Sequence, residues 1–442
     1  MNRDEFHRGL NSRTLAYLPE FKADARPVVL FLGESGYSFP GQVLLLGLVN
    51  MLARAHQRII VVGDVKADLL GRDPFGHRGL EGAITHLATG VNPVIEFDAV
   101  EKPPPHEPLI TLGLAVPAEQ RIGCAGWTAT FGEDAAIGGD RGSITGAILA
   151  ACLGAATAFH RQVGRSGRPE GVYSLWDYGA ASGMQGPDMD GPLDVGRVLQ
   201  VGVGAVGAAL DYWMAFLGFA GSWSLADGDQ VDVTNLNRQL YFLAVDAGWD
   251  DQPIANKADV VAGRLGTGAL SSPHMYGVDE HVVEADYDVI LPLANEGGVR
   301  PALQSRAEPV LLHATTTPNW TSIAHRHVVS LDDCIVCRLQ NEEDPSFTCS
   351  TGSTDSTRRN DASLPFLSGL AGALLLRDLI ALQAGRLVER GTNFAAINLA
   401  EPVPLTRELR WACRSECKAR LPASVRRPLA DGSRFAHLDR EV

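Results

Sequence analysis

Short apolar runs alternate along the chain with glycine turns and with helical stretches rich in small residues. Residues 28–42 open with a β-branched run that leads into a glycine-containing turn, and residues 198–211 (VLQVGVGAVGAALD) repeat this opening. A second apolar run follows each opening, at 58–63 and at 223–227. Strands that alternate with helices are typical of parallel βαβ units, so the pattern predicts an α/β fold of doubly wound, mostly parallel sheets.

Two further pairs of segments occur in the same order in both parts of the chain. CAGWTAT at 124–130 resembles TPNWTSI at 317–323, and the helical run 144–158 resembles 365–379. Four matches in one order indicate an internal duplication rather than two unrelated α/β domains. We therefore expect a first Rossmann-like domain at 1–170, a Gly- and Pro-rich linker at 171–192, and a second such domain at 193–442.

Composition narrows the class of protein. A length of 442 residues fits two domains, and 45% hydrophobic with 20% charged residues is typical of a globular protein. The net charge of −14 argues against a nucleic-acid partner. The first residues carry charges and no apolar run, and later runs fall short of the roughly 20 residues that cross a bilayer. With an odd cysteine count, this predicts a cytoplasmic protein with reduced thiols and no membrane partner.

The turn at the start of the second half has the composition of a nucleotide-binding turn. Gly202, Gly204 and Gly207 follow an apolar strand and open a helix, where backbone amides and the helix dipole favour phosphate. Asp227 lies 20 residues beyond Gly207, at the end of the next strand, where it is placed to bind ribose hydroxyls. A nicotinamide-dependent oxidoreductase shares these two features, so they leave the ligand open.

The residues after Asp227 favour a triphosphate. The string from Asp227 to Gln239 (DGDQVDVTNLNRQ) is dense in polar groups, and Lys257 is the only lysine between positions 103 and 417. The guanidinium of Arg238, which can donate two parallel hydrogen bonds, and the ammonium of Lys257 could both stabilise the negative charge that develops when the α–β bond of ATP breaks. A solvated loop with a surface lysine is the alternative.

This string, D-x-D-x-V-D-x-x-N-L-N-R-Q with a downstream lysine, resembles the ubiquitin-activating enzyme family, which includes the ThiF- and MoeB-like enzymes that adenylate sulfur carriers. The resemblance covers residues 190–420 well and 1–160 as a degenerate, inactive copy. It implies that Asp227 binds the ribose of ATP and that Asn235, Arg238 and Lys257 hold its phosphates. The reaction that it implies is adenylation of a carboxylate.

Two further residues follow from the resemblance. The family holds Mg²⁺ with an Asp-Asn pair after a later strand; here Asn295 stands where the aspartate is expected, and Glu296 is the possible Mg²⁺ ligand. The family also borrows an arginine from a neighbouring N-terminal helix. The Ser-Arg-x-Leu string near the N-terminus is similar to that motif, so Arg13 is the candidate, with Arg8 as the alternative.

The cysteines divide into two sets. Cys334 with Cys337, and Cys413 with Cys417, form two close pairs that predict a tetrahedral zinc site with four thiolate ligands. Cys349 stands apart in a polar stretch, and the segment 338–364 resembles the crossover loop in which activating enzymes carry their thioester-forming cysteine. Cys124 and Cys152 sit in apolar segments and are expected to be buried thiols.

The sequence therefore predicts a bacterial activating enzyme that uses ATP, Mg²⁺ and Zn²⁺. Its partners would be a ubiquitin-like protein with a C-terminal glycine and a conjugating enzyme that receives the acyl group from Cys349. The alternatives are a sulfur-carrier-protein adenylyltransferase and a non-catalytic partner subunit, the latter favoured by Asn295.

Overall fold

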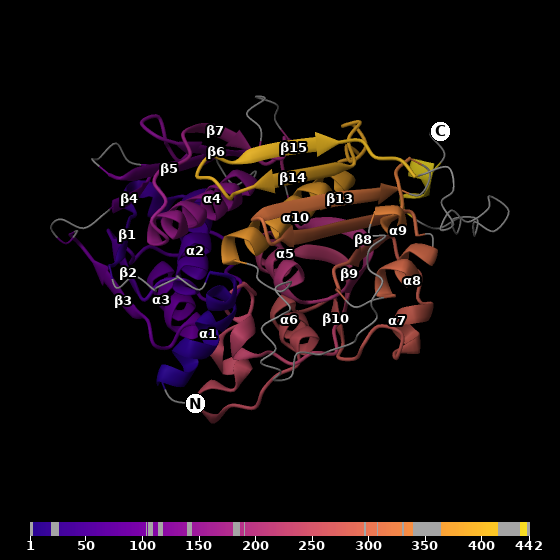
Figure 1. The fold of residues 1–442 in the computed structure, drawn as a ribbon, viewed down its shortest axis with the longest axis horizontal. Coiled ribbons are helices and arrows are strands. Elements are labelled where there is room, and N and C mark those ends of the chain that lie inside the picture. The colour runs from indigo at the N-terminus through magenta and orange to yellow at the C-terminus, as the bar shows by residue number, and fades with distance from the viewer. Residues whose placement is uncertain are drawn as a thin grey trace.

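The computed structural model describes most of the chain. The described residues are 3–18, 26–102, 104, 109–113, 118–138, 144–179, 186–189, 191–295, 298–306, 308–328, 331–338, 364–413 and 434–439. Among them are two large β-sheets with helices between and around them (Figure 1).

The first sheet has seven strands in the order β3-β2-β1-β4-β5-β6-β7. The pairs from β3 to β5 are parallel, and β6 and β7 are added antiparallel. The strands are β1 (Val28–Phe31), β2 (Arg58–Val62), β3 (Glu96–Val100), β4 (Leu109–Leu112), β5 (Gln120–Ala125), β6 (Thr128–Phe131) and β7 (Gly171–Ser174).

The second sheet repeats this order with one extra strand: β10-β9-β8-β11-β12-β13-β14-β15. It too is parallel over its first five strands and antiparallel beyond β12. The strands are β8 (Leu193–Val201), β9 (Phe219–Ala226), β10 (Ala269–Ser272), β11 (Val289–Pro292), β12 (Val310–Thr317), β13 (Thr321–Val328), β14 (Phe394–Asn398) and β15 (Leu405–Leu409). Each of the four matched pairs of sequence segments falls on elements with the same place in the two halves.

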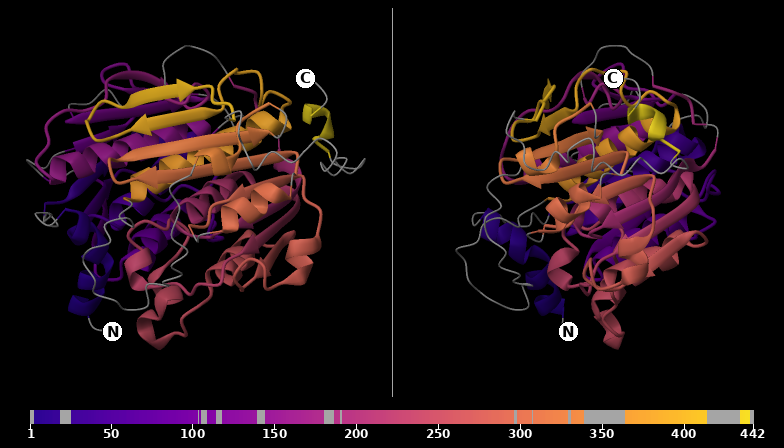
Figure 2. Two further views of the ribbon diagram at one scale, coloured as in Figure 1. Left: turned by 45° about the vertical axis from the view of Figure 1, so that its right-hand side comes forward. Right: turned by 90° about the vertical axis from the view of Figure 1, so that its right-hand side faces the viewer.

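Helices α2, α4, α5 and α10 form a layer between the two sheets (Figures 1 and 2). The described helices of four or more residues are α1 (Arg3–Tyr17), α2 (Phe39–Ala53), α3 (Leu80–Val91), α4 (Thr145–Gln162), α5 (Ala205–Leu217), α6 (Lys257–Leu265), α7 (Glu280–Glu284), α8 (Val299–Ser305), α9 (Ile335–Arg338) and α10 (Pro365–Gln383). Short 3-10 turns are η1 (Gly33–Tyr37), η2 (Val233–Asn235), η3 (Ala244–Ala247), η4 (Trp249–Asp251) and η6 (Ala436–Asp439).

Helices α2 and α10 are mostly apolar, and other elements bury them on all sides. Every residue of α10 from Pro365 to Leu382 is buried, and it packs against α4 and α5 as well as β12 and β13. Among the described residues α10 is the one helix long and apolar enough to cross a membrane, but its apolar window lies wholly inside the protein. One continuous hydrophobic core therefore spans both halves.

Most strand pairs in both sheets are parallel, as expected, and antiparallel strands extend one end of each. Two other details differ from the sequence-based prediction. The helices of the first sheet, α2, α3 and α4, pack together on one face, so only the second sheet has described helices on both faces. The segment 171–192 also contributes β7 to the first sheet and is not a linker throughout.

Asp211, on α5, is a buried carboxyl group that gives the fold a testable pH dependence. Gln200 Nε2 donates to its Oδ2 at 3.0 Å, its Oδ1 has no partner, and burial raises its pKa to about 8. The folded protein therefore binds a proton that the unfolded chain lacks between about pH 4 and pH 8, and stability falls as pH rises through that window, by about 1.4 kcal/mol per unit.

Asp211→Asn removes this linkage. Relative to the wild type, its free energy of unfolding should increase by about 2 to 3 kcal/mol between pH 5 and pH 7.5. Urea denaturation of both proteins at the two pH values measures the difference. An Asn variant that loses stability in parallel with the wild type over this range would show that Asp211 is ionised in the folded protein.

Candidate functional site

The glycine turn joins β8 to α5 and has little room on one side and open space on the other. A Cβ at Gly202 would lie 2.5 Å from the backbone nitrogen of Ala294, and a Cβ at Gly207 would lie 2.4 Å from the carbonyl oxygen of Gly202. No atom of the described residues other than its chain neighbours lies within 4 Å of a Cβ built at Gly204. Gly202 and Gly207 thus permit close packing, whereas Gly204 leaves its backbone accessible to a phosphate.

The turn lies at the switch point of the second sheet. The chain runs from β8 outward to β9 and β10 and then returns to β11 on the other side of β8. Gly202 follows β8, Asp227 follows β9, and Asn295 follows β11, so all three lie at the carboxyl edge of adjacent parallel strands. Open α/β sheets bind ligands at this position.

Asp227 connects the glycine turn to the next strand. Its Oδ2 accepts from the backbone amide of Val203 at 2.6 Å, and its Oδ1 accepts from the amide of Asp229 at 2.9 Å. Burial raises the pKa of Asp227, while Lys257 and these two amides oppose the shift. The carboxylate is fixed beside the turn, in the position expected for a ribose ligand.

Lys257 is the first residue of α6, and its charge lies against Asp229. The Nζ–Oδ2 distance is 2.7 Å; the lysine side chain is 6% exposed and that of Asp229 39% exposed. Asn256 caps α6 by accepting from the amides of Ala258 and Asp259, and it also donates to the carbonyl of Asp227 at 3.1 Å. These bonds hold Lys257 and Asp227 in one cluster. The sequence interpretation did not assign Asp229 a role, although the D-x-D spacing was the available signal.

Asn235 and Arg238 lie in a mostly buried stretch, residues 233–242, which begins with η2 and which we call the polar segment. Arg238 donates to the carbonyl of Thr234 at 2.8 Å and to Asn237 Oδ1 at 2.9 Å. Asn235 accepts from Gln239 Nε2 at 2.8 Å. Both side chains are thus oriented by bonds within the segment.

Arg13 of α1 reaches the polar segment of the other half. Its Nε donates to Thr234 Oγ1 at 3.3 Å, and the neighbouring Thr14 accepts from Asn237 Nδ2 at 3.4 Å. A Cβ at Gly9 would lie 2.7 Å from Val233 Cγ1, so α1 packs closely on η2. The structure therefore brings the predicted Arg13 to the segment that carries Asn235 and Arg238.

Asn295 is paired with an arginine. Arg300 Nη2 donates to Asn295 Oδ1 at 3.1 Å, and Arg300 is buried on α8. The side-chain oxygen of Asn295, which stands where the family has an aspartate, therefore already accepts a hydrogen bond. Glu296 lies outside the described residues.

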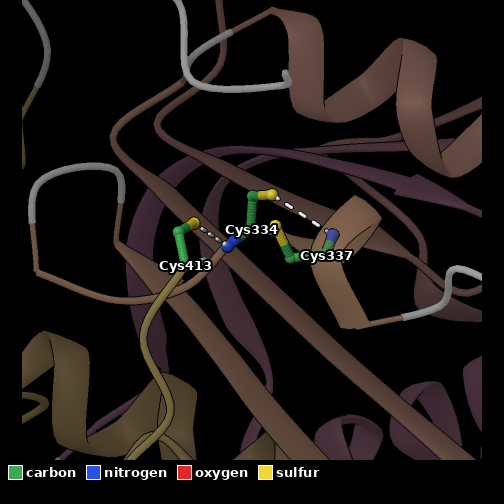
Figure 3. Close-up of side chains that lie close together, drawn as sticks. All are labelled: Cys334, Cys337 and Cys413. Atoms are coloured by element: carbon green, nitrogen blue, oxygen red, sulfur yellow. Dashed lines mark hydrogen bonds between the residues drawn. The ribbon is translucent and has the colours of Figure 1, made fainter. Parts of the chain in front are cut away.

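Three of the four predicted zinc ligands meet at one corner of the second sheet (Figure 3). The sulfur atoms of Cys334, Cys337 and Cys413 lie within 4.8 Å of one another. The amide of Cys334 donates to Cys413 Sγ at 3.1 Å, and the amide of Cys337 donates to Cys334 Sγ at 3.3 Å. Amide donors favour thiolates, so the donor set fits a zinc ion. Cys417 lies outside the described residues.

A buried polar cluster supports this corner. Asp333, next to Cys334, accepts from His325 Nε2 at 2.8 Å, from Asn393 at 2.9 Å and from Arg338 at 3.1 Å. His327 Nδ1 lies 2.7 Å from the carbonyl of Asp333, and burial lowers its pKa to about 3. The bonds to its carboxylate fix Asp333, the residue before the first cysteine, whereas His327 Nε2 is buried and has no hydrogen-bond partner among the described residues. The sequence interpretation missed them; H-x-H on a strand followed by Asp-Cys was the available signal.

The other cysteines separate as follows. Cys124 and Cys152 are buried, as expected, and burial raises the pKa of both thiols, that of Cys124 to about 12. Cys349 lies outside the described residues, as does the rest of the predicted loop between Arg338 and Leu364.

The two halves of the chain match different protein families. Residues 29–172 match the BilD N-terminal domain family, and residues 186–271 match the ThiF family. The chain is 27% identical over 258 residues to the uncharacterised protein y4jF of Sinorhizobium fredii (strain NBRC 101917 / NGR234). That match covers 55% of this chain and 47% of y4jF, about half the length of this curated relative.

Similar solved structures include two of the enzyme MccB. The structure of E. coli MccB with ATP is 17% identical in sequence to this chain. The match covers 56% of this chain and 68% of MccB, with a TM-score of 0.39. The microcin C7 biosynthetic enzyme MccB in complex with N-formylated MccA is 14% identical, covering 68% and 98% at a TM-score of 0.39. The sequence matches therefore show a likeness to the ThiF family over residues 186–271 and to the BilD N-terminal domain family over residues 29–172.

Proposed function

We propose that this protein uses ATP to adenylate the C-terminal glycine carboxylate of a ubiquitin-like protein. The observation that supports this best is the arrangement of the site: Asp227 contacts the glycine turn, Lys257 is held beside it, and Arg13 reaches the polar segment from the first half. Attack at the α-phosphorus of ATP requires a group that binds the ribose, a turn whose amides face the phosphates, and several cations.

In the proposed first step, a carboxylate oxygen of the carrier attacks the α-phosphorus of ATP. The α–β bond breaks, and the electron pair leaves with pyrophosphate. Arg238, Lys257 and Arg13 stabilise the growing charge, while Asp227 and the glycine turn orient the nucleotide. Mg²⁺ would arrive bound to the triphosphate and neutralise part of its charge, with Glu296 as our proposed protein ligand.

In the proposed second step, the thiolate of Cys349 attacks the carrier's acyl carbon. AMP leaves, and the resulting thioester is then transferred to the cysteine of a conjugating enzyme. Cys334, Cys337, Cys413 and Cys417 would bind a structural Zn²⁺ close to the start of the segment that carries Cys349. The setting that we propose is cytoplasmic.

Pyrophosphate exchange separates these steps. The protein is mixed with ATP, labelled pyrophosphate and candidate carriers ending in glycine, and the assay is repeated with Cys349→Ala. We expect carrier-dependent exchange in both proteins, because adenylation precedes thiol attack. A thiol-sensitive conjugate should form only with the wild type.

Each outcome points to one function. Exchange without any thioester in the wild type would contradict the second step and favour a sulfur-carrier-protein adenylyltransferase. No exchange with any carrier would contradict adenylation and favour a non-catalytic partner subunit, the alternative that the Asn295–Arg300 pair supports.

A further inference from the structure

The polar segment is buried but has little regular structure of its own. Residues 235–244 are all buried, and beyond η2 and η3 the described backbone there has neither helix nor strand bonding. Buried main-chain carbonyls without ladder partners need donors from elsewhere in the protein. The question is which side chains supply them.

Arg54, at the end of α2 in the first half, supplies most of them. Its guanidinium donates to the carbonyls of Leu240 at 2.9 Å and Phe242 at 3.2 Å, and it also bonds the carbonyl of Leu236. Asn50, one turn earlier, donates to the carbonyl of Leu240 at 2.9 Å. These bonds cross from the first half to the segment that carries Asn235 and Arg238.

Arg54 is itself held in one orientation. Asn50 Oδ1 accepts from Arg54 Nε at 3.0 Å and from Nη2 at 2.8 Å. Arg54 is 2% exposed, and in the described part of the chain no carboxylate forms an ion pair with it. Burying an arginine without a counter-charge is costly, so carbonyl oxygens must stabilise the charge. Because Arg54 is buried, its charge does not serve to make the protein surface soluble.

The opposite side of the same segment is tied to the helix of Lys257. Arg264, on α6, bonds the carbonyl of Tyr241 and binds Asp246 through both carboxylate oxygens, at 2.9 and 2.7 Å. The hydroxyl of Tyr241 donates to the carbonyl of Pro74 in the first half at 3.0 Å. The segment is thus fixed between α2 of one half and α6 of the other.

We propose that Arg54 and Asn50 are positioning residues for ATP binding: the first half uses them to hold the main chain of residues 236–242 in the shape that presents Asn235 and Arg238 to the nucleotide. This inference rests on the proposed function, because it assigns the first half a second contribution to the same site besides Arg13. Neither residue touches the nucleotide; both act through the backbone.

The test compares Arg54→Lys with Arg377→Lys. Arg377 is also fully buried, and it donates to a main-chain carbonyl of the other half, at 3.1 and 3.2 Å, but that carbonyl belongs to Trp176 and not to the polar segment. Lysine keeps the charge and loses the fork in both variants. We expect both to lower the melting temperature, and only Arg54→Lys to weaken ATP binding in calorimetric titration, by roughly tenfold.

Two further measurements test the positioning role even if Arg54→Lys folds poorly. Asn50→Ala leaves the guanidinium in place and should weaken ATP binding roughly threefold. In the nucleotide-free protein, amide hydrogen exchange within 236–242 should accelerate in the Arg54 and Asn50 variants and not in Arg377→Lys. Equal losses of ATP affinity in the Arg54 and Arg377 variants, with unchanged exchange at 236–242, would overturn the positioning role. A wild-type protein that binds no ATP would instead refute the proposed function itself.

Discussion

Lys257→Ala is expected to lower carrier-dependent ATP–pyrophosphate exchange by about 10²- to 10³-fold. Lys257 is a nearly buried cation held 2.7 Å from Asp229, in a cluster with Asp227. In the proposed reaction its loss removes a positive charge where pyrophosphate develops negative charge, and no second lysine lies between positions 103 and 417 to replace it. Because Asp229 is 39% exposed, water can hydrate its carboxylate in the variant, so the fold should persist.

The matched control is Lys66→Ala. Lys66 follows a strand end of the first half, is exposed, and lies near Asp64, whose carboxylate accepts from its backbone amide at 2.9 Å. We expect its exchange rate to stay within about twofold of the wild type, since surface charges at a distance are screened. A Lys257→Ala protein that folds and keeps more than about a tenth of wild-type exchange would remove Lys257 from the proposed phosphate contacts.

The second large effect is expected from the cysteine corner. Purified protein should contain about one zinc per chain, and Cys334→Ser should lose it and lower the free energy of unfolding by about 4 kcal/mol or more. The reason is that the Cys334 sulfur would be one of the zinc ligands and also accepts a hydrogen bond from the backbone amide of Cys337. The backbone amide of Cys334 in turn donates a hydrogen bond to the sulfur of Cys413. Metal analysis and urea denaturation, with and without a chelator, provide the measurement.

Cys152→Ala serves as the comparison for the zinc prediction. Cys152 is a fully buried thiol of α4, so the change creates a small cavity and leaves the metal content unaltered. A wild-type protein with clearly less than one zinc per chain, whose stability does not respond to a chelator, would rule out the four-cysteine site.

The arrangement of strands could be predicted from the sequence because each element carries a local pattern. The glycine turn at Gly202 marks the end of β8, and the tryptophans in CAGWTAT and TPNWTSI mark equivalent hairpins. The face of each sheet that the helices cover could not be predicted. It depends on the path of each connection between strands, whereas the hydrophobic periodicity of the sequence shows only where a helix forms. The edge strand β7 was missed because two of its four residues are exposed and its sequence shows no alternation of apolar and polar residues.

Within the site, the residues that could be predicted belong to sequence motifs, whereas Arg54, which reaches the site by a tertiary contact and carries no motif, could not. Asp227, Asn235, Arg238 and Lys257 stand close together in sequence, and a terminal motif indicated Arg13. Arg54 lies 182 residues before its acceptor Leu236, at the end of a helix that is apolar apart from Gln42 and Asn50. Nothing local connects the two, although an arginine at the end of an apolar helix is the kind of residue that requires a buried partner.

The contact of α1 with η2 has a consequence for how the protein behaves on dilution. When an arginine is supplied by a separate subunit, the fraction of complete sites falls as the concentration drops below the dissociation constant. Here Arg13 and its target Thr234 belong to one chain whose halves share a single core, so the arginine is present at a fixed effective concentration. The composition of this site therefore does not depend on how many copies of the protein a cell contains.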